Sequence, residues 1–239
     1  MRSLALACLA LLMAAPAPAD WDHPIKWDQL DPGSGWGAAS FVCYDTPNNA
    51  ITADDFFCDG TLPIITDIEF YGWSYYGEDN YIDAFRISFW TDVPATPEDE
   101  SHPGDLLYDV EVGYQYLGEN HFQINLPEDL WFYQGPDEQI LWISIQGVMT
   151  TDDIPDAFYW EILEAGYTWG DDAAFTSDYW DYPPWYNWGW MTPDAPAVYD
   201  GPFPDGWYAS ADMRFRLNGI PEPASISLLG LGLVLLRRR

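Results

Sequence analysis

Apolar and polar residues alternate along most of the chain, which is the pattern of β-strands with one buried face. The clearest run places Phe85, Ile87 and Phe89 on one side and Arg86 and Ser88 on the other. The same alternation recurs with apolar sides formed by Ile64, Thr66, Ile68 and Phe70; Val110, Val112 and Tyr114; Phe122, Ile124 and Leu126; Leu141, Ile143 and Ile145; Phe158, Trp160 and Ile162; and Met213, Phe215 and Leu217. With a strand around Phe41 to Tyr44, we expect about eight strands.

Proline and glycine separate these runs, as at His102-Pro103-Gly104 and Gly135-Pro136-Asp137, and no helical period appears between the two ends of the chain. Strands with one apolar face and no helix to cover them must pack against another sheet. We therefore expect an all-β domain, an antiparallel two-sheet β-sandwich of the jelly-roll type, with an immunoglobulin-like arrangement as the alternative.

The two ends of the chain differ from this pattern. Residues 1–19 hold a cation at Arg2, an apolar stretch, and small residues at Ala17 and Ala19, which together predict a secretory signal peptide cleaved before Asp20. Residues 220–239 hold a short apolar segment that predicts a helix of about 13 residues, roughly 20 Å long and shorter than the hydrocarbon core of a bilayer. The terminal arginines predict that this helix enters the membrane transiently with its cationic end on the cytoplasmic side. Residues 20–219 then form the exported domain.

The C-terminal segment contains Pro221, Glu222 and Pro223, then the apolar helix, then Arg237, Arg238 and Arg239. This order resembles the PEP-CTERM sorting signal of bacteria. The resemblance implies recognition by an exosortase-type membrane transpeptidase, cleavage near the Pro-Glu-Pro motif, and delivery to the cell surface or an exopolysaccharide matrix.

Runs within the domain, such as "ADDFFCDG" (53–60), "FRISFWTDVPA" (85–95) and "DMRFRL" (212–217), resemble a family of PEP-CTERM-linked surface domains without an assigned function. This second resemblance implies a β-sandwich and carries no catalytic residues.

The composition is strongly acidic, with 39 Asp and Glu against 8 Lys and Arg and a formal net charge of −31. Such a surface repels nucleic acid, so nucleic-acid binding is excluded as a function. It favours solubility and attracts divalent cations, and solubility alone is a sufficient explanation for the charge. A hydrophobic fraction of 48% is ample for a packed core.

Cys43 and Cys58 remain once the leader has been removed. In an exported protein this pair predicts a disulfide that closes a loop of about 15 residues, worth about 3 kcal/mol in the chain-entropy description. Two buried thiols are the alternative.

The stretch from Asp178 to Trp190 is unusually aromatic and contains two consecutive prolines, which predict a loop. Its rings could form a stacking surface for sugars, or they could close one end of the core. The candidate sugar-binding residues are Trp180, Trp185, Tyr186, Trp188 and Trp190.

Pairs of adjacent acidic residues are candidate ligands for calcium, which prefers six to eight oxygen ligands. Asp54, Asp55 and Asp59 are the best candidates, because the expected disulfide at Cys58 would hold their loop rigid. No acidic run fits the EF-hand spacing, so calcium is a possible rather than a required cofactor.

Catalytic motifs are missing from the sequence, including G-x-S-x-G and H-E-x-x-H, and only three histidines are present. We therefore expect a non-catalytic protein of the cell envelope, surface or extracellular matrix with a structural or adhesive role. A carbohydrate-binding module that contacts extracellular polysaccharide is the alternative, and a glycoside hydrolase or lyase is a distant third.

Overall fold

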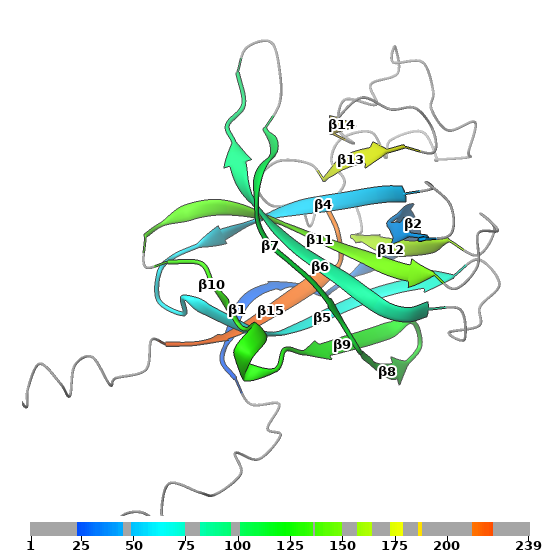
Figure 1. Ribbon diagram of the computed structural model, residues 1–239, viewed down its shortest axis with the longest axis horizontal. Coiled ribbons are helices and arrows are strands. Elements are labelled where there is room, and N and C mark those ends of the chain that lie inside the picture. Colours follow the sequence, from blue (N-terminus) through cyan, green and yellow to red (C-terminus); the bar gives the residue numbers. More distant parts are fainter. Residues whose placement is uncertain are drawn as a thin grey trace, which may run out of the picture.

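The protein folds as two β-sheets that face each other (Figure 1). The computed structural model describes residues 23–44, 49–74, 82–96, 101–135, 137–149, 157–163, 173–178, 186–187 and 212–221. Within them the secondary structure is strand apart from one short 3₁₀ turn, η2 (Glu128–Leu130). The expectation of an all-β domain built from two sheets is confirmed.

The first sheet has eight strands among the described residues, with β5 at its centre. β5 pairs with β15 and β12 along one edge and with β9 and β10 along the other. Its strands are β1 (Ile25–Gln29), β2 (Gly33–Ala39), β5 (Ile64–Ser74), β8 (Gln115–Gly118), β9 (His121–Asn125), β10 (Phe132–Tyr133), β12 (Phe158–Leu163) and β15 (Phe215–Ile220).

The second sheet has seven strands within the same described ranges, in the order β14-β13-β4-β3-β11-β6-β7. Its pairings are antiparallel except for the short parallel pair between β3 and β11, so the expectation of a purely antiparallel sandwich needs that correction. The strands are β3 (Phe41–Val42), β4 (Asn49–Cys58), β6 (Ile82–Val93), β7 (His102–Val112), β11 (Gln139–Met149), β13 (Ala174–Ser177) and β14 (Tyr186–Asn187).

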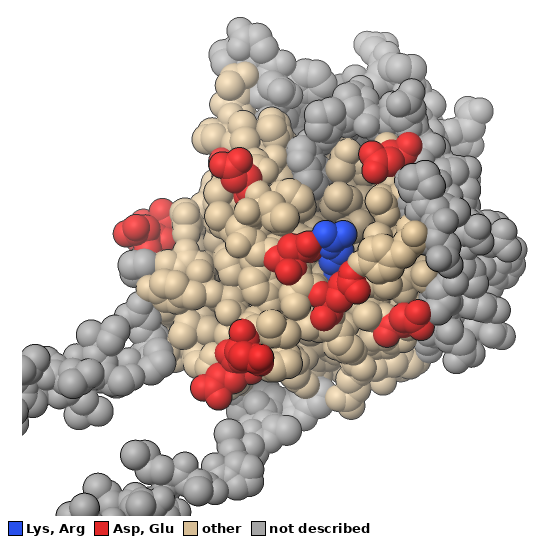
Figure 2. Space-filling model, in the orientation of Figure 1, with Lys and Arg blue, Asp and Glu red and all other residues tan. Residues whose placement is uncertain are grey.

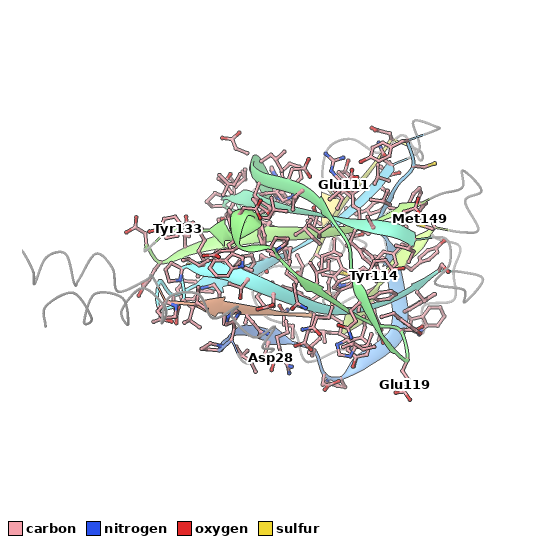
Figure 3. All side chains as sticks on the ribbon, turned by 60° about the horizontal axis from the view of Figure 1, so that its bottom comes forward. Asp28, Glu111, Tyr114, Glu119, Tyr133 and Met149 are labelled. Atoms are coloured by element: carbon pink, nitrogen blue, oxygen red, sulfur yellow. The ribbon has the colours of Figure 1, made fainter. Side chains whose placement is uncertain are left out.

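The core lies between the sheets and is rich in aromatic rings (Figure 3). Phe70 and Phe122 stack with centroids 5.5 Å apart, and the edges of Phe85 and Phe158 pack against both rings. Edge-to-face contacts of this kind add stability beyond the area that the rings bury. The alternation in β6, β9, β12 and β15 places the predicted apolar residues in this core.

The two ends of the sandwich carry different parts of the chain. β1 pairs with β15, so the first and last described strands lie side by side, and Lys26 of β1 contacts Cys58 at the end of β4. At the other end, Ser177 pairs with Ala50 near the start of β4, and Figure 3 shows Tyr133 and Met149 at opposite ends of the molecule. We call the end with Ile25, Cys58 and Ile220 the terminal pole, and the end with Asn49, Met149 and Ser177 the distal pole.

The residues described include no helix with the length and apolar character needed to cross a membrane. The predicted signal peptide, 1–19, and the predicted C-terminal helix, 224–236, both lie outside the described residues.

Candidate functional site

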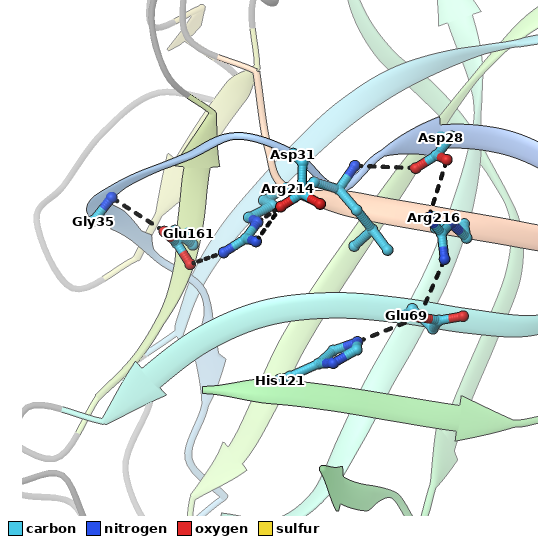
Figure 4. Close-up of polar contacts among 9 residues, drawn as sticks. Asp28, Asp31, Gly35, Glu69, His121, Glu161, Arg214 and Arg216 are labelled. Carbon is cyan, nitrogen blue, oxygen red and sulfur yellow. Dashed lines mark hydrogen bonds and ion pairs between the residues drawn. The ribbon is translucent and has the colours of Figure 1, made fainter. Parts of the chain in front are cut away.

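The outer face of the eight-stranded sheet carries the largest cluster of ion pairs in the described part of the chain (Figure 4). Residues of alternate positions face away from the core, so β5, β9, β12 and β15 contribute polar side chains to this surface. The register sets Phe70 opposite Phe215 on one side and opposite Phe122 on the other. The outward-facing residues next to these three phenylalanines therefore lie in one row across the sheet.

Arg214 is the centre of this row. Its Nη1 donates to Glu161 Oε2 at 2.9 Å, its Nη2 donates to Asp31 Oδ1 at 2.7 Å, and its Nε donates to the carbonyl of Leu30. The Arg214 side chain is 12% exposed and that of Glu161 is 9% exposed, so water screens this pair little. A guanidinium whose three nitrogens all donate holds loop 30–31 against strand β12.

Tyr71 lies between two cationic or potentially cationic groups. The guanidinium carbon of Arg214 is 3.3 Å from the centroid of the Tyr71 ring, and the His121 ring stacks on Tyr71 with centroids 4.3 Å apart. Arg214 comes from the β15 side of β5 and His121 from the β9 side, so the two groups cover opposite faces of the ring. Burial raises the pKa of Tyr71, although the charge of Arg214 acts in the opposite direction.

Glu69 connects the residues around Arg214 to a second set of ion pairs around Arg216. Its Oε2 lies 3.3 Å from Nε2 of His121 and 3.6 Å from Nη1 of Arg216, whose Nη2 donates to Asp28 at 3.0 Å. Burial lowers the pKa of His121, and the Glu69 carboxylate opposes that shift. The network thus joins strands β1, β5, β9, β12 and β15 through side chains as well as through the backbone.

Glycines in β2 leave the space that the network occupies. A Cβ atom on Gly33 would approach Arg214 Nη1 to 2.7 Å and would collide with the Glu161 carboxylate. A Cβ on Gly37 would approach the Trp73 ring to 2.9 Å, and the Gly35 amide donates to Glu161 at 3.1 Å. Gly33 and Gly37 are therefore required by packing on this face, whereas Gly35, with open space around it, is required by its positive φ of 76°.

The face in Figure 2 shows how charge is spread elsewhere on the molecule. Acidic side chains are scattered over that surface, and the basic side chain in view lies against acidic neighbours. Arg86 of β6 is paired in this way with Asp109 of β7, with Nε to Oδ1 at 2.7 Å. Arginines in the described residues are thus neutralised by carboxylates.

A second polar cluster lies inside the sandwich. Asp54 of β4 is fully buried, and its carboxylate accepts from the Met213 amide at 2.8 Å and from the Asp55 amide at 3.1 Å. Asp212 is also buried and accepts from Gln29 at 3.4 Å. Burial raises the pKa of Asp54 well above its usual range, and the nearby carboxyls of Asp212 and Asp55 raise it further.

The predicted calcium site at Asp54, Asp55 and Asp59 is wrong. Asp54 and Asp55 are consecutive residues of strand β4, so their side chains point to opposite faces of the sheet. Asp59 is exposed beyond the strand and accepts from the Thr61 amide and hydroxyl at 2.9 and 2.8 Å. Across the described ranges, no group of three or more His, Cys, Asp or Glu residues is arranged to hold a metal ion.

The predicted disulfide between Cys43 and Cys58 is also wrong, and both residues are buried thiols. Cys43 follows β3, whose Val42 pairs with Asn49 at the start of β4, whereas Cys58 ends that ten-residue strand. At about 3.3 Å per residue the two ends of β4 are roughly 30 Å apart. A disulfide needs Cα atoms within about 7 Å.

The aromatic stretch lies mostly outside the described residues. Trp180, Trp185, Trp188 and Trp190 are not described, and of Tyr186 only its backbone pairing with Phe175 is known. Asp178, where the stretch begins, is placed at the distal pole by the bond from its amide to the Asn49 carbonyl, at 3.2 Å. Of the Pro-Glu-Pro motif, Pro221 is described and exposed, and Glu222, Pro223, Arg237, Arg238 and Arg239 are not.

The three histidines hold no arrangement typical of a catalytic base. His23 uses one nitrogen, Nδ1, for both Thr66 Oγ1 at 2.8 Å and Asp67 Oδ2 at 2.7 Å. His102 Nδ1 contacts the Pro103 carbonyl, and His121 is stacked on Tyr71. A triad needs the two ring nitrogens on different partners, with a nucleophile at one of them.

The sequence does not predict the ion-pair network. Arg214, Arg216, Glu69 and His121 alternate with apolar residues, which predicts only that they lie on polar strand faces. The sequence does not say which strands are neighbours, so it could not bring these residues together. The signal that was available is the rarity of cations, because two of the four in residues 20–219 lie in one five-residue run, 212–216.

Comparison with known proteins gives one match. A protein-family model described as a domain of unknown function (DUF7901) matches residues 25–218. No curated protein and no solved structure matches the chain.

Proposed function

This chain belongs to the DUF7901 family, and we propose that it is a non-catalytic protein exported to the cell surface or the extracellular matrix, where its role is structural or adhesive. The observation that carries this proposal is that the two ends of the sandwich, the terminal pole and the distal pole, differ. The first and last described strands meet at the terminal pole, and Asp178, where the aromatic stretch begins, lies at the distal pole. Because β4 spans the two poles, they are roughly 30 Å apart.

This separation of the terminal pole from the distal pole suits a domain that is attached through its chain ends. A chain held at the membrane or the matrix through its C-terminal segment would have the distal pole turned away from the attachment. The acidic surface would keep neighbouring copies apart and soluble. The predicted leader, the Pro-Glu-Pro motif and the terminal arginines support export, transient membrane insertion and processing by an exosortase-type transpeptidase.

A non-catalytic role is supported by how the polar residues are used. The arginines, Glu69, Glu161 and His121 contact one another across strands and thereby brace the sheet. Within the sandwich we propose the jelly-roll type of connection, with the immunoglobulin-like arrangement as the alternative.

Fractionation of the source cells tests the proposal. We expect the full-length chain in the surface or matrix fraction, and we expect a variant without Arg237 to Arg239 to lose that location. A variant with three lysines in place of these arginines is the matched control, because it keeps the positive charge and the membrane orientation. The same location for all three chains would contradict the sorting argument.

The second candidate is a carbohydrate-binding module that uses Trp180, Trp185, Tyr186, Trp188 and Trp190. It is favoured by the position of Asp178 at the distal pole, from which this stretch would face extracellular polysaccharide. A chain with Trp185→Ala and Trp188→Ala should lose retention on a polysaccharide column. The control is Tyr133→Ala, an aromatic that is 51% exposed at the terminal pole. Equal retention of both chains, or none for the wild type, would reject this candidate.

A further inference from the structure

Lys26, the only lysine in the chain, lies beside a cysteine. Its Nζ is 3.8 Å from Sγ of Cys58. Lys26 belongs to β1 in the eight-stranded sheet, and Cys58 is the last residue of β4 in the seven-stranded sheet. The pair therefore connects the two layers of the sandwich at the terminal pole.

The environment of the pair favours reaction between the two side chains. Cys58 is fully buried and Lys26 is its neighbour, so a peroxide reaches the sulfur through a local opening of the terminal pole. Burial lowers the pKa of Lys26, although Cys58 and Asp59 act in the opposite direction, and a lower pKa increases the fraction of neutral, nucleophilic amine. The other cysteine of the exported domain, Cys43, is at the distal pole and cannot reach Cys58.

We propose that Lys26 and Cys58 are the site of an oxidative cross-link, a sulfenamide bond between Nζ and Sγ that forms when a peroxide reaches the pair. In the first step the thiol attacks the peroxide, the O–O bond breaks, and the sulfur is oxidised by two electrons to a sulfenic acid. One peroxide oxygen stays on sulfur and the other leaves as water. In the second step the lone pair of Nζ attacks sulfur, the S–O bond breaks, and the departing hydroxide takes a proton from nitrogen and leaves as a second water.

The cross-link goes beyond the proposed function and has a structural consequence of its own. It joins β1 to β4 in place of the disulfide that the cysteine count suggested. A covalent bond there ties the two sheets together where both described ends of the domain lie, and it raises the melting temperature by restricting the unfolded chain, as a disulfide does.

Hydrogen peroxide and mass spectrometry test the proposal on the folded full-length chain. We expect the mass to fall by about 2 Da through the loss of two hydrogens, and peptide mapping to find Lys26 and Cys58 in one linked species that a thiol reductant separates. After the treated protein has been unfolded in denaturant, only the Cys43 thiol of the pair Cys43 and Cys58 should react with an alkylating reagent. The treated protein should also melt at a higher temperature than the untreated protein.

Three variants make the result specific. Lys26→Arg keeps the charge but removes the amine, so Cys58 should gain oxygen without a linked peptide. Cys58→Ser should abolish the link, and Cys43→Ser, which removes the other buried thiol, should retain it. Thermal unfolding of each variant confirms that it is folded. An unchanged mass in the wild type, a link that survives in Lys26→Arg, or a link lost in Cys43→Ser would overturn the proposal.

Discussion

The guanidinium carbon of Arg214 lies 3.3 Å above the ring of Tyr71, while the same group is paired with Glu161 and Asp31. An arginine can stack and donate at the same time because its guanidinium is planar, and a lysine cannot do both. In a chain with a net charge of −31 this residue removes the repulsion between carboxylates that approach one another on the sheet. The ion-pair network is therefore the element that makes an acidic sheet face stable.

The first prediction concerns Arg214 itself. Arg214→Ala leaves the nearly buried Glu161 without its cation, and we expect the free energy of unfolding to fall by about 3 to 5 kcal/mol. Arg214→Lys should lose less, because it keeps the charge. Urea unfolding measures both. Arg86→Ala is the control, since its pair with Asp109 is partly exposed and should contribute less than about 1 kcal/mol. Equal losses for Arg214→Ala and Arg86→Ala would contradict the network as described.

A second prediction concerns the packing of Gly33. In Gly33→Ala the new Cβ approaches Arg214 Nη1 to 2.7 Å, so the network must shift. We expect a loss of about 1 to 3 kcal/mol, as for other overpacked sites. Gly113→Ala is the matched control, because its Cβ would meet nothing within 4 Å. That control should stay within about 0.5 kcal/mol of the wild type. A Gly33→Ala protein as stable as Gly113→Ala would show that the space beside Glu161 is not needed.

The third prediction is a pH dependence that comes from Asp54. Its pKa is raised in the folded protein, so above about pH 4 the unfolded chain releases this proton while the folded chain keeps it. The contribution of Asp54 to stability is therefore present at low pH and is lost as the pH rises towards the raised pKa. Asp54→Asn should remove this decline, which is measured as the difference in unfolding free energy between wild type and variant from pH 4 to pH 8.

Asp59→Asn is the control for that experiment. Hydrogen bonds from Thr61 lower the pKa of Asp59, so its contribution is present above the usual aspartate pKa and is lost as the pH falls. When the series is extended to about pH 2, Asp59→Asn should change the pH dependence below about pH 4, with the opposite sign to the change that Asp54→Asn makes above it. If the free energies of unfolding of the wild type and Asp54→Asn change in parallel with pH, Asp54 is ionised in the folded protein.

Much of the fold was predictable from alternation alone, since Phe85, Ile87, Phe89, Phe215 and Leu217 are all in the core. Alternation predicts the wrong side chains for the core where both faces of a strand are buried or where the register of the strand shifts. Trp142 lies between Leu141 and Ile143, so alternation predicts that it faces away from the core, yet it is fully buried and donates to Asp92 at 2.9 Å. A shift between Asn218 and Gly219 brings Ile65 into the core in place of Ile64.

The misassigned segment around Asp54 shows why local composition was misleading. Two adjacent aspartates predict a loop, because ionised carboxylates are seldom buried. The fold accommodates Asp54 through two backbone amide donors, one from Asp55 in β4 and one from Met213 of the facing sheet, and through a raised pKa. The assumption of a loop then made both the disulfide and the calcium site look reasonable. Neither the disulfide nor the calcium site is compatible with β4 as a strand that spans the sandwich.

The proposed function requires that the domain is exported and processed at both ends before it acts at the surface. The most direct measurement is N-terminal sequencing and intact mass of the protein recovered from its source cells. We expect a surface or matrix protein that begins at Asp20 and has lost the residues after the Pro-Glu-Pro motif. A full-length chain in the cytoplasm, with its leader and Arg237 to Arg239 intact, would contradict it.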